Sequence, residues 1–183
     1  MKIVNQELAY DGYFKIVKYS VENKSGKIFP KECFERGDSV AAVIWDANKE
    51  RFIFTKQYRI GLKDEVIEIV AGSMDKENEA PVEALIREIN EELGYELTDD
   101  EIDMVEHIAS VYVSPGGTSE RIHIFLVTVT NQVADGGGVG DEEISRVEMT
   151  SQEILDWLPK IQDAKTLIGM LHVVKKSMSL SMA

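Results

Sequence analysis

Three glutamates and an arginine lie close together near the middle of the chain, at spacings that could bind a cation. Glu88 and Glu92 are four residues apart, and Glu91 is three residues from Glu88. A helix therefore places their carboxylates on one patch, about 6 Å apart along its axis. These like charges repel one another, but the repulsion becomes attraction once Mg²⁺ or Mn²⁺, which prefer clustered oxygen ligands, is bound. The alternative is a solvated acidic face.

The residues around these glutamates have the period of an amphipathic helix over 79–93. Apolar residues recur every three or four positions and leave the charged residues on another face: Val82, Leu85, Ile86, Ile89 and Leu93. Pro81 suits the first turn, and Gly94 suits the position where a helix ends. Just upstream, residues 65–70 predict a short strand that leads into Ala71 and Gly72. These small residues would let backbone carbonyls approach the same point.

The remaining patterns favour strands over helices. Alternating and β-branched segments predict strands at 3–10, 13–21, 27–34, 39–46, 51–58, 105–113, 121–130 and 144–149, and capped apolar segments predict helices at 151–158 and 164–176. Because strands and helices do not alternate regularly, we expect an α+β fold. Residues 1–37 predict a small antiparallel sheet that cannot be stable alone. Residues 38–183 are expected to form the main domain.

The composition limits the partners. The 183 residues include 33 Asp and Glu against 20 Lys and Arg, a formal charge of −13. This excess argues against nucleic acid or an anionic membrane as the partner, although a small anion is compatible if bound cations reverse the local field. The single cysteine, Cys33, excludes an internal disulfide and a thiolate zinc cluster. With no long apolar run and no signal-like N-terminus, we expect a cytoplasmic protein.

The motif around the glutamates resembles the Nudix box, whose pattern is G-x5-E-x7-R-E-U-x-E-E-x-G-U, with U an aliphatic residue. The chain has Gly72, then Glu79, then Arg87-Glu88-Ile89-Asn90-Glu91-Glu92-Leu93-Gly94-Tyr95. It departs from the pattern in two places: six residues separate Gly72 from Glu79, and Tyr95 replaces the last aliphatic residue. The resemblance implies the Nudix fold, in which a mixed β-sheet lies between helices, here with an N-terminal sheet added.

The same resemblance implies roles for the residues of the box. Glu88 and Glu92 would bind Mg²⁺ or Mn²⁺, and Glu91 would contribute directly or through water. The backbone oxygen of Ala71 would also reach a metal, while Arg87 would hold the carboxylates in place. Such cations would neutralise a pyrophosphate and lower the pKa of a bound water.

Outside the box, the chain is similar to the ADP-ribose and nucleoside-diphosphate-sugar pyrophosphatases, in particular to GDP-mannose hydrolases. The similar segments are residues 57–61, 65–72, 114–120 and 134–144. The likeness implies that Arg59 grips a phosphate and that Glu68 lies near the substrate or a metal. Ser119 and Glu120 would line the substrate loop, where Glu120 could bind a ribose hydroxyl or a metal. For Arg59, Glu68 and Glu120, an ordinary surface role is the alternative.

In that group a carboxylate on the glycine-rich loop, here residues 134–144, activates the attacking water. When Ile144 is aligned with that group, Glu142 falls at a position where relatives have a glutamate that contacts metal or acts as the base. Glu142 is therefore the favoured base and metal contact, with Asp141 and Glu143 as alternatives. Gly140 replaces a residue that is acidic in some relatives. A glycine-rich loop could bring such a carboxylate to the water when substrate binds.

The resemblance also implies a homodimer, because in that group the N-terminal sheet exchanges between subunits. Tyr13, Phe14 or Tyr19 would then be candidates to stack on the nucleobase. The expected reaction splits a nucleoside diphosphate sugar or ADP-ribose into a nucleoside monophosphate and a sugar phosphate. The alternatives are a hydrolase of modified nucleotides and a non-catalytic Nudix-fold sensor of nucleotide sugars. No residue pattern identifies the nucleobase, the sugar or the number of metals.

Overall fold

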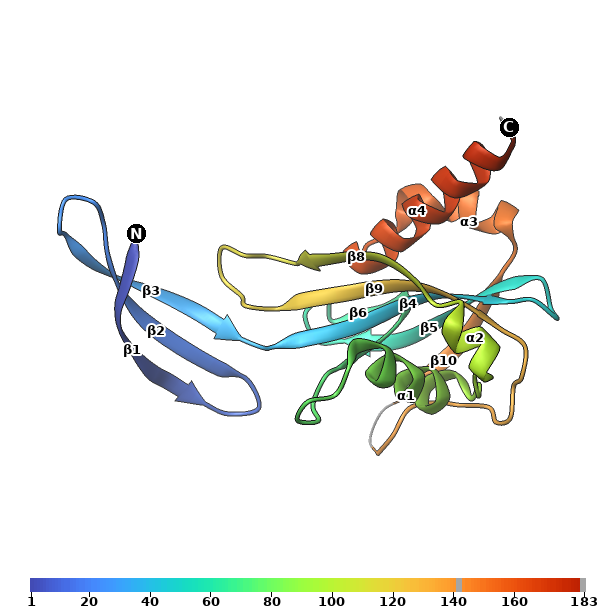
Figure 1. Cartoon of the computed structure of the whole chain (residues 1–183), viewed down its shortest axis with the longest axis horizontal. Coiled ribbons are helices and arrows are strands. Elements are labelled where there is room, and N and C mark those ends of the chain that lie inside the picture. Colours follow the sequence, from blue (N-terminus) through green and yellow to red (C-terminus); the bar gives the residue numbers. More distant parts are fainter. Residues whose placement is uncertain (141–142, 182–183) are drawn as a thin grey trace. The chain divides into compact units, whose positions relative to one another are not determined.

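The structure is a computed structural model that describes residues 1–140 and 143–181 (Figure 1). Its internal contacts divide the chain into two compact units. The first contains residues 1–38 and 111–122, and the second contains the remaining described residues. The segment 111–122 thus groups with the N-terminal sheet, although it is distant in sequence. A domain boundary after residue 37 stays a prediction.

The first unit is built on a three-stranded antiparallel sheet. Its strands are β1 (Lys2–Asp11), β2 (Lys15–Glu22) and β3 (Ile28–Glu35), paired in that order. These strands match the three that the sequence predicts. Every residue of β1 is exposed, including Leu8, which has 51% of its surface accessible. Strand β1 therefore leaves apolar side chains uncovered and presents a free edge.

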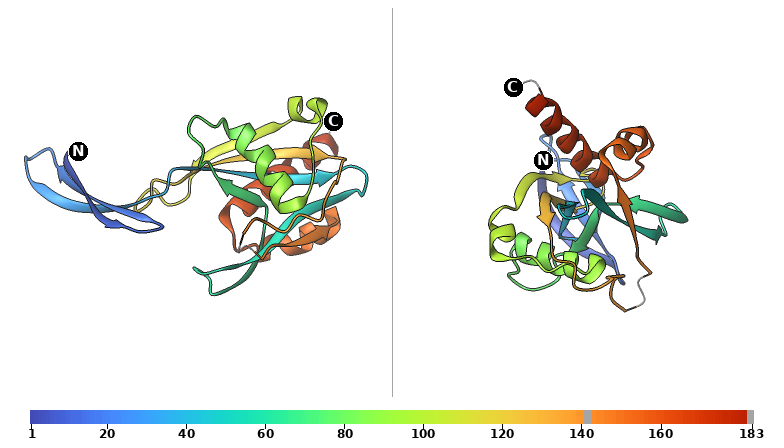
Figure 2. Two further views of the ribbon diagram at one scale, coloured as in Figure 1. Left: turned by 90° about the horizontal axis from the view of Figure 1, so that it is seen from below. Right: turned by 90° about the vertical axis from the view of Figure 1, so that its right-hand side faces the viewer.

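A seven-stranded sheet, most of which belongs to the second unit, has helices on both faces (Figures 1 and 2). Its central order is β10-β5-β4-β9-β8, with β6 beside β5 and β7 beside β4. The strands are β4 (Asp38–Asp46), β5 (Arg51–Arg59), β6 (Asp64–Glu68), β7 (Val70–Ser73), β8 (Glu106–Tyr112), β9 (Arg121–Val129) and β10 (Ser145–Met149). The helices are α1 (Pro81–Leu93), α2 (Asp99–Asp103), α3 (Ser151–Trp157), the 3₁₀ turn η1 (Leu158–Lys160) and α4 (Ala164–Ser181).

Strand β4 shows how the sheet is buried on both faces. Val40, Ala42 and Ile44 belong to the hydrophobic cluster that includes the buried side of α1. On the opposite face Val43 contacts Gly169 of α4 so closely that a Cβ at Gly169 would overlap it. Successive residues of a strand point to opposite faces, so an apolar run such as β4 suits a central strand covered twice. The expected α+β fold, with a mixed sheet between helices, is confirmed.

The structure differs from the predicted elements in two ways. The strand predicted at 65–70 is two strands, because the chain turns at Ile69 and pairs first with β5 and then with β4. At the turn, the buried Ile69 amide donates to Thr166 Oγ1 on α4 over 2.9 Å. Helix α2 was not predicted, although the capping box of Thr98 and Glu101 marks its start.

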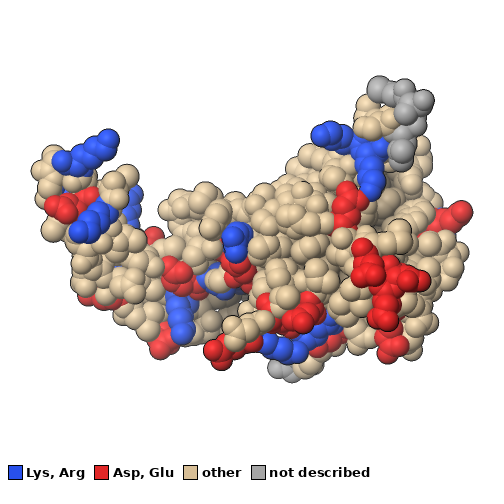
Figure 3. Space-filling model, viewed as in Figure 1, with Lys and Arg blue, Asp and Glu red and all other residues tan. Residues whose placement is uncertain are grey.

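The distribution of charge agrees with the acidic composition. Figure 3 shows acidic side chains gathered over α2, which has four acids among its five residues. On the face drawn, described Lys and Arg side chains occur in small separate groups rather than as one basic surface. Such a face lacks the continuous positive potential that a polynucleotide backbone requires. Among the described residues, no helix is long and apolar enough to cross a membrane.

Candidate active site

Helix α1 is held firmly at both ends, which fixes its carboxylates. At its start, Pro81 occupies the first turn and the amide of Ala80 donates to Glu83 Oε2 over 2.9 Å. At its end, Gly94 has a φ of 71°, the left-handed conformation that terminates many helices. Its apolar side packs into the core, with Ala84, Leu85, Ile89 and Leu93 fully buried.

Arg87 gathers the carboxylates of this region. Its Nη1 donates to Glu88 Oε1 over 2.5 Å and to Glu91 Oε2 over 3.3 Å. Its Nε donates to Glu79 Oε1 over 3.2 Å, and its Nη2 donates to the carbonyl oxygen of Ser73 over 3.1 Å. Arg87 thus ties α1 to the end of β7 and to the loop between them. We call Glu79, Arg87, Glu88, Glu91 and Glu92 the Arg87 cluster.

Charge in the Arg87 cluster is unbalanced. Burial disfavours the Arg87 guanidinium, but its bonds to Glu79 and Glu88 outweigh this effect and raise its pKa. The hydrogen bond from Arg87 likewise lowers the pKa of Glu79. Lys76, which is largely exposed, approaches Glu79 only to 4.0 Å. The cluster therefore contains four carboxylates, and the two cations described beside them are Arg87 and Lys76. Two of the carboxylates, those of Glu88 and Glu92, are largely buried.

Gly72 allows the cluster to meet the backbone of the sheet. A Cβ at Gly72 would overlap the carboxyl group of Glu88. The missing side chain lets that carboxylate lie against β7, directly after Ala71. Carboxylate oxygens and a backbone carbonyl are hard donors of the kind that Mg²⁺ and Mn²⁺ accept. Within residues 1–140 and 143–181, however, no three acidic, histidine or cysteine side chains already converge in a metal-binding arrangement.

A second ionic cluster surrounds Glu68 at the end of β6. Glu68 is only 2% exposed, and its Oε1 accepts from Arg59 Nε over 2.6 Å. Its other oxygen pairs with Lys165 of α4, and Lys165 also contacts Asp163 Oδ1 at 3.0 Å. We call Arg59, Glu68, Asp163 and Lys165 the Glu68 cluster. The structure brings together Arg59 and Glu68, two residues singled out from the sequence.

Lys165 joins this cluster, although no sequence motif predicts a role for it. It lies 97 residues from Glu68, so no local spacing could reveal the contact. Asp163 lies directly before α4, and its Oδ2 accepts from the amide of Thr166 over 2.9 Å. Burial raises the pKa of Asp163, but the Lys165 charge and the bonds from Thr166 outweigh it, so the pKa lies below its usual value.

Ser119 and Glu120 belong to the first unit. Ser119 Oγ accepts from the amide of Arg36 over 3.0 Å, and Glu120 Oε1 lies 3.4 Å from Arg36 Nε. The Arg36 guanidinium in turn lies over the ring of Phe14, 5.1 Å from its centre. These contacts with Arg36 do not connect Ser119 or Glu120 to the Arg87 cluster. Their contact with substrate remains a prediction.

The glycine-rich loop is anchored on the C-terminal end of α1. The amides of Gly137 and Gly138 donate to the carbonyls of Glu92 and Glu91, over 3.0 and 3.2 Å. They satisfy carbonyls that a helix end leaves without partners. The preferred base, Glu142, and its alternative Asp141 lie outside the described residues. Glu143 is described and exposed.

Comparison with known proteins shows the family of this chain. A sequence model of the NUDIX domain matches residues 35–168. The chain belongs to the Nudix family. The match spans β4 to the start of α4 and so includes both the Arg87 cluster and the Glu68 cluster.

Relatives of this Nudix chain extend over nearly its whole length. The GDP-mannose pyrophosphatase of Cronobacter sakazakii is 28% identical, and the alignment covers 94% of each chain. The GDP-mannose pyrophosphatase of Escherichia coli O157:H7 is 29% identical, with 91% of each chain covered. The crystal structure of an ADP compounds hydrolase superposes with a TM-score of 0.79 and 18% identity, covering 98% of this chain and 95% of that one. That likeness concerns the fold.

Proposed function

We propose that this Nudix protein hydrolyses the pyrophosphate bond of a nucleoside diphosphate sugar or ADP-ribose, releasing a nucleoside monophosphate and a sugar phosphate. The observation that carries the proposal is the Arg87 cluster. One arginine contacts three carboxylates, and Gly72 leaves room for one of them against the sheet. An acidic excess of this kind favours divalent cations, and cations favour a pyrophosphate. The names of the relatives support the same substrate class.

Mg²⁺ or Mn²⁺ is the proposed cofactor, and the donors of the Arg87 cluster fit it. Glu88, Glu92 and the carbonyl oxygen of Ala71 would hold the metal, with Glu91 contributing directly or through water. Once bound, such ions polarise P–O bonds and lower the pKa of a bound water. Arg87 keeps the carboxylates from separating, and it also restrains the loop that carries Glu79.

The Glu68 cluster is proposed to bind the phosphate end of the substrate. The Arg59 side chain is 41% exposed while its Nε is fixed on Glu68, so its planar group is both accessible and oriented. Lys165 adds a second cation held in place by two carboxylates. Prior fixing of these cations lowers the entropy lost when phosphate binds.

A carboxylate of the glycine-rich loop is proposed to act as the general base. Glu142 is the first choice, and Asp141 and Glu143 are the alternatives. Glu142→Gln is expected to lower kcat by about 10²–10⁴-fold with little change in KM, the usual effect of losing a base. Turnover close to that of the unchanged enzyme would reject Glu142. Asp141→Asn and Glu143→Gln, measured beside it, would then identify which alternative takes its place.

We also propose that the protein is a homodimer, acting in a reducing cytoplasm in keeping with its single free cysteine. Strand β1 exposes apolar side chains along an open edge, and a second copy would cover them. Near it, Tyr13 is 93% exposed beside Phe14, whereas Tyr19 donates to Glu35, a bond that raises the pKa of Tyr19 to about 12. A monomer mass by light scattering at micromolar concentration would reject the dimer.

The substrate class is tested with a panel of GDP-mannose, ADP-ribose, ADP-glucose and 8-oxo-dGTP. We expect Mg²⁺-dependent release of a nucleoside monophosphate and a sugar phosphate from at least one of the first three. Preference for 8-oxo-dGTP would favour a hydrolase of modified nucleotides. Binding of nucleotide sugars without turnover, measured by calorimetry with Mg²⁺ or Mn²⁺, would instead favour a sensor.

A further inference from the structure

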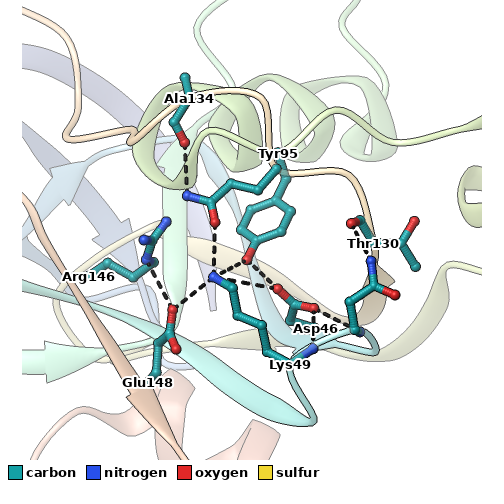
Figure 4. Close-up of polar contacts among 9 residues, drawn as sticks. Asp46, Lys49, Tyr95, Thr130, Ala134, Arg146 and Glu148 are labelled. Carbon is teal, nitrogen blue, oxygen red and sulfur yellow. Dashed lines mark hydrogen bonds and ion pairs between the residues drawn. The ribbon is translucent and has the colours of Figure 1, made fainter.

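A partly buried network of polar and charged side chains lies just beyond the C-terminal end of α1 (Figure 4). Its centre is Tyr95, which is fully buried and occupies the position where the Nudix pattern has an aliphatic residue. The Tyr95 hydroxyl donates to Asp46 Oδ2 over 2.6 Å. Asp46, only 2% exposed, also accepts from the amides of Asn48 and Lys49. The hydroxyl that Tyr95 adds at this position is therefore used in a hydrogen bond to a buried carboxylate.

Lys49 uses all its donors within this network. Its ammonium has three N–H groups, and its Nζ donates to Tyr95 Oη over 3.3 Å, to Gln132 Oε1 over 2.9 Å and to Glu148 Oε1 over 2.9 Å. Asp46 Oδ2 lies 3.7 Å away as a further counter-charge. Burial raises the pKa of Asp46, but bonds from Tyr95 and the amides, together with the Lys49 charge, lower it below its usual value. The carboxylate of Asp46 is therefore favoured despite its burial.

The ammonium of Lys49 fixes the orientation of Gln132. Because an ammonium can only donate, Gln132 must turn its oxygen toward Lys49 and its amide nitrogen away. That nitrogen donates to the carbonyl of Ala134 over 2.9 Å. A carbonyl can only accept, so the two contacts together allow one orientation of the side chain. Ala134 is the first residue of the glycine-rich loop.

The loop held in this way is the same loop that closes the end of α1. The amides of Val133 and Ala134 donate to the carbonyl of Gly94, over 2.8 and 3.1 Å. A Cβ at Gly94 would overlap the backbone of Ala134, and a Cβ at Gly136 would overlap that of Glu92. Helix and loop therefore approach at backbone distance. A shift of Ala134 must move the loop relative to the residues of the Arg87 cluster.

We propose that Lys49, acting through Gln132 and braced by Tyr95 and Asp46, is a positioning residue that holds the glycine-rich loop against the C-terminal end of α1. This role rests on the proposed function, in which a carboxylate of that loop acts as the general base. The partners of Lys49 Nζ described above are all protein side chains. Loss of Lys49 leaves the carboxylates of α1 and the cations of the Glu68 cluster intact.

The test compares Lys49→Met, Lys49→Arg and Gln132→Glu in the full chain. Lys49→Met removes the charge but keeps an unbranched stem. Gln132→Glu still accepts from Lys49 but cannot donate to Ala134. The control is Lys176→Met, which removes another lysine from an ion pair, with Glu106, outside the network. Amide hydrogen exchange and steady-state kinetics with Mg²⁺ are measured for each variant.

Both Lys49→Met and Gln132→Glu are expected to speed exchange of amides 133–138 at least about tenfold, with exchange in β5 and α4 unchanged. Each is expected to lower kcat about tenfold with KM within about twofold, because displacing a catalytic group by ~1 Å can cost about 100-fold. Lys49→Arg is expected to recover most of both effects. The control is expected to change neither.

Three outcomes would overturn the assignment: loop exchange as in the unchanged protein, faster loop exchange with unaltered kcat, or faster exchange throughout the domain. The last two would make Lys49 an ordinary stabilising residue. If the unchanged protein hydrolyses none of the nucleotide sugars, the proposed function fails. Hydrogen exchange alone then decides whether Lys49 anchors the loop. Failure of the proposed hydrolase function and failure of the Lys49 role can therefore be told apart.

Discussion

The Arg87 cluster and the Glu68 cluster both combine carboxylates with cations, but their charge balance differs. Around Arg87, one guanidinium contacts three carboxylates, and Glu92 adds a fourth acid on the same helix. Around Glu68, two cations face two carboxylates. A balanced cluster is complete in itself and can present an accessible cation to an anion. An unbalanced one gains stability when further positive charge arrives. Balance, rather than the number of charged residues, separates the two proposed roles.

Removing one acid from the unbalanced Arg87 cluster is expected to have the largest effect and tests whether this cluster binds metal. Glu92→Gln is expected to lower kcat about 10³-fold, since the metal supplies several kcal/mol and each ~1.4 kcal/mol corresponds to tenfold. Raising the Mg²⁺ or Mn²⁺ concentration should recover part of the loss. The matched control, Glu96→Gln, makes the same charge change at an exposed residue. Equal kinetics for the two variants would remove Glu92 from the metal site.

Loss of a cation from the balanced cluster should act on binding instead. Lys165→Met is expected to raise KM for the nucleotide sugar about 10- to 100-fold, the cost of losing a charged contact of roughly 1.5–3 kcal/mol. The metal dependence of kcat should stay the same. Lys56→Met, which breaks an exposed pair with Glu65, serves as the control. A change in metal affinity with KM unaltered would contradict the division of roles.

A single methyl group should disturb the unbalanced cluster through geometry alone. At Gly72→Ala the new Cβ overlaps the Glu88 carboxyl group, so that side chain must move. Because charge is unchanged, we expect a loss of about tenfold in kcat from misplacement. Gly61→Ala is the control, since a Cβ there meets nothing within 4 Å. Full activity of Gly72→Ala would show that the close approach is dispensable.

The smallest expected effect is on stability. The folded protein lowers the pKa of Asp163, so its stabilising contribution is present above the unfolded pKa of ~3.9 and is lost as pH falls through the folded value. Asp163→Asn should therefore cost about 1 kcal/mol at pH 7 and progressively less below about pH 4. Urea unfolding at pH 7 and pH 3 measures this difference. A cost that is independent of pH would assign the effect to capping geometry rather than charge.

Local sequence patterns were enough to predict the helix that carries the unbalanced Arg87 cluster. The helix with Arg87 and the glutamates has a regular apolar period, a proline at its start and Gly94 at its end, and all of these act within a few residues. Strand β4 was equally clear from its apolar run. Helix α2 was missed even though Thr98 and Glu101 form a readable capping box, because it is only five residues long.

The balanced cluster could be predicted only in part, because its contacts join distant segments. Arg59 and Glu68 were found by resemblance, but Lys165 reaches Glu68 across 97 residues. The break between β6 and β7 was equally hidden. Residues 65–70 contain neither glycine nor proline to mark a turn, and the turn at Ile69 depends on Thr166, which is also 97 residues away. The network of Asp46, Lys49 and Tyr95 needed three-dimensional structure for the same reason.

The hydrogen bond from Ile69 to Thr166 has a consequence for the shortest functional fragment of this protein. Helix α4 follows every strand of the sheet, yet its first turn stabilises the bend between β6 and β7, the strands that lead to the two clusters. A fragment that stops after α3 would uncover Val43 and Ile69 and leave Glu68 without Lys165. The minimal hydrolase therefore has to run at least through Gly169, so a tag or deletion at the C-terminus should spare the beginning of α4.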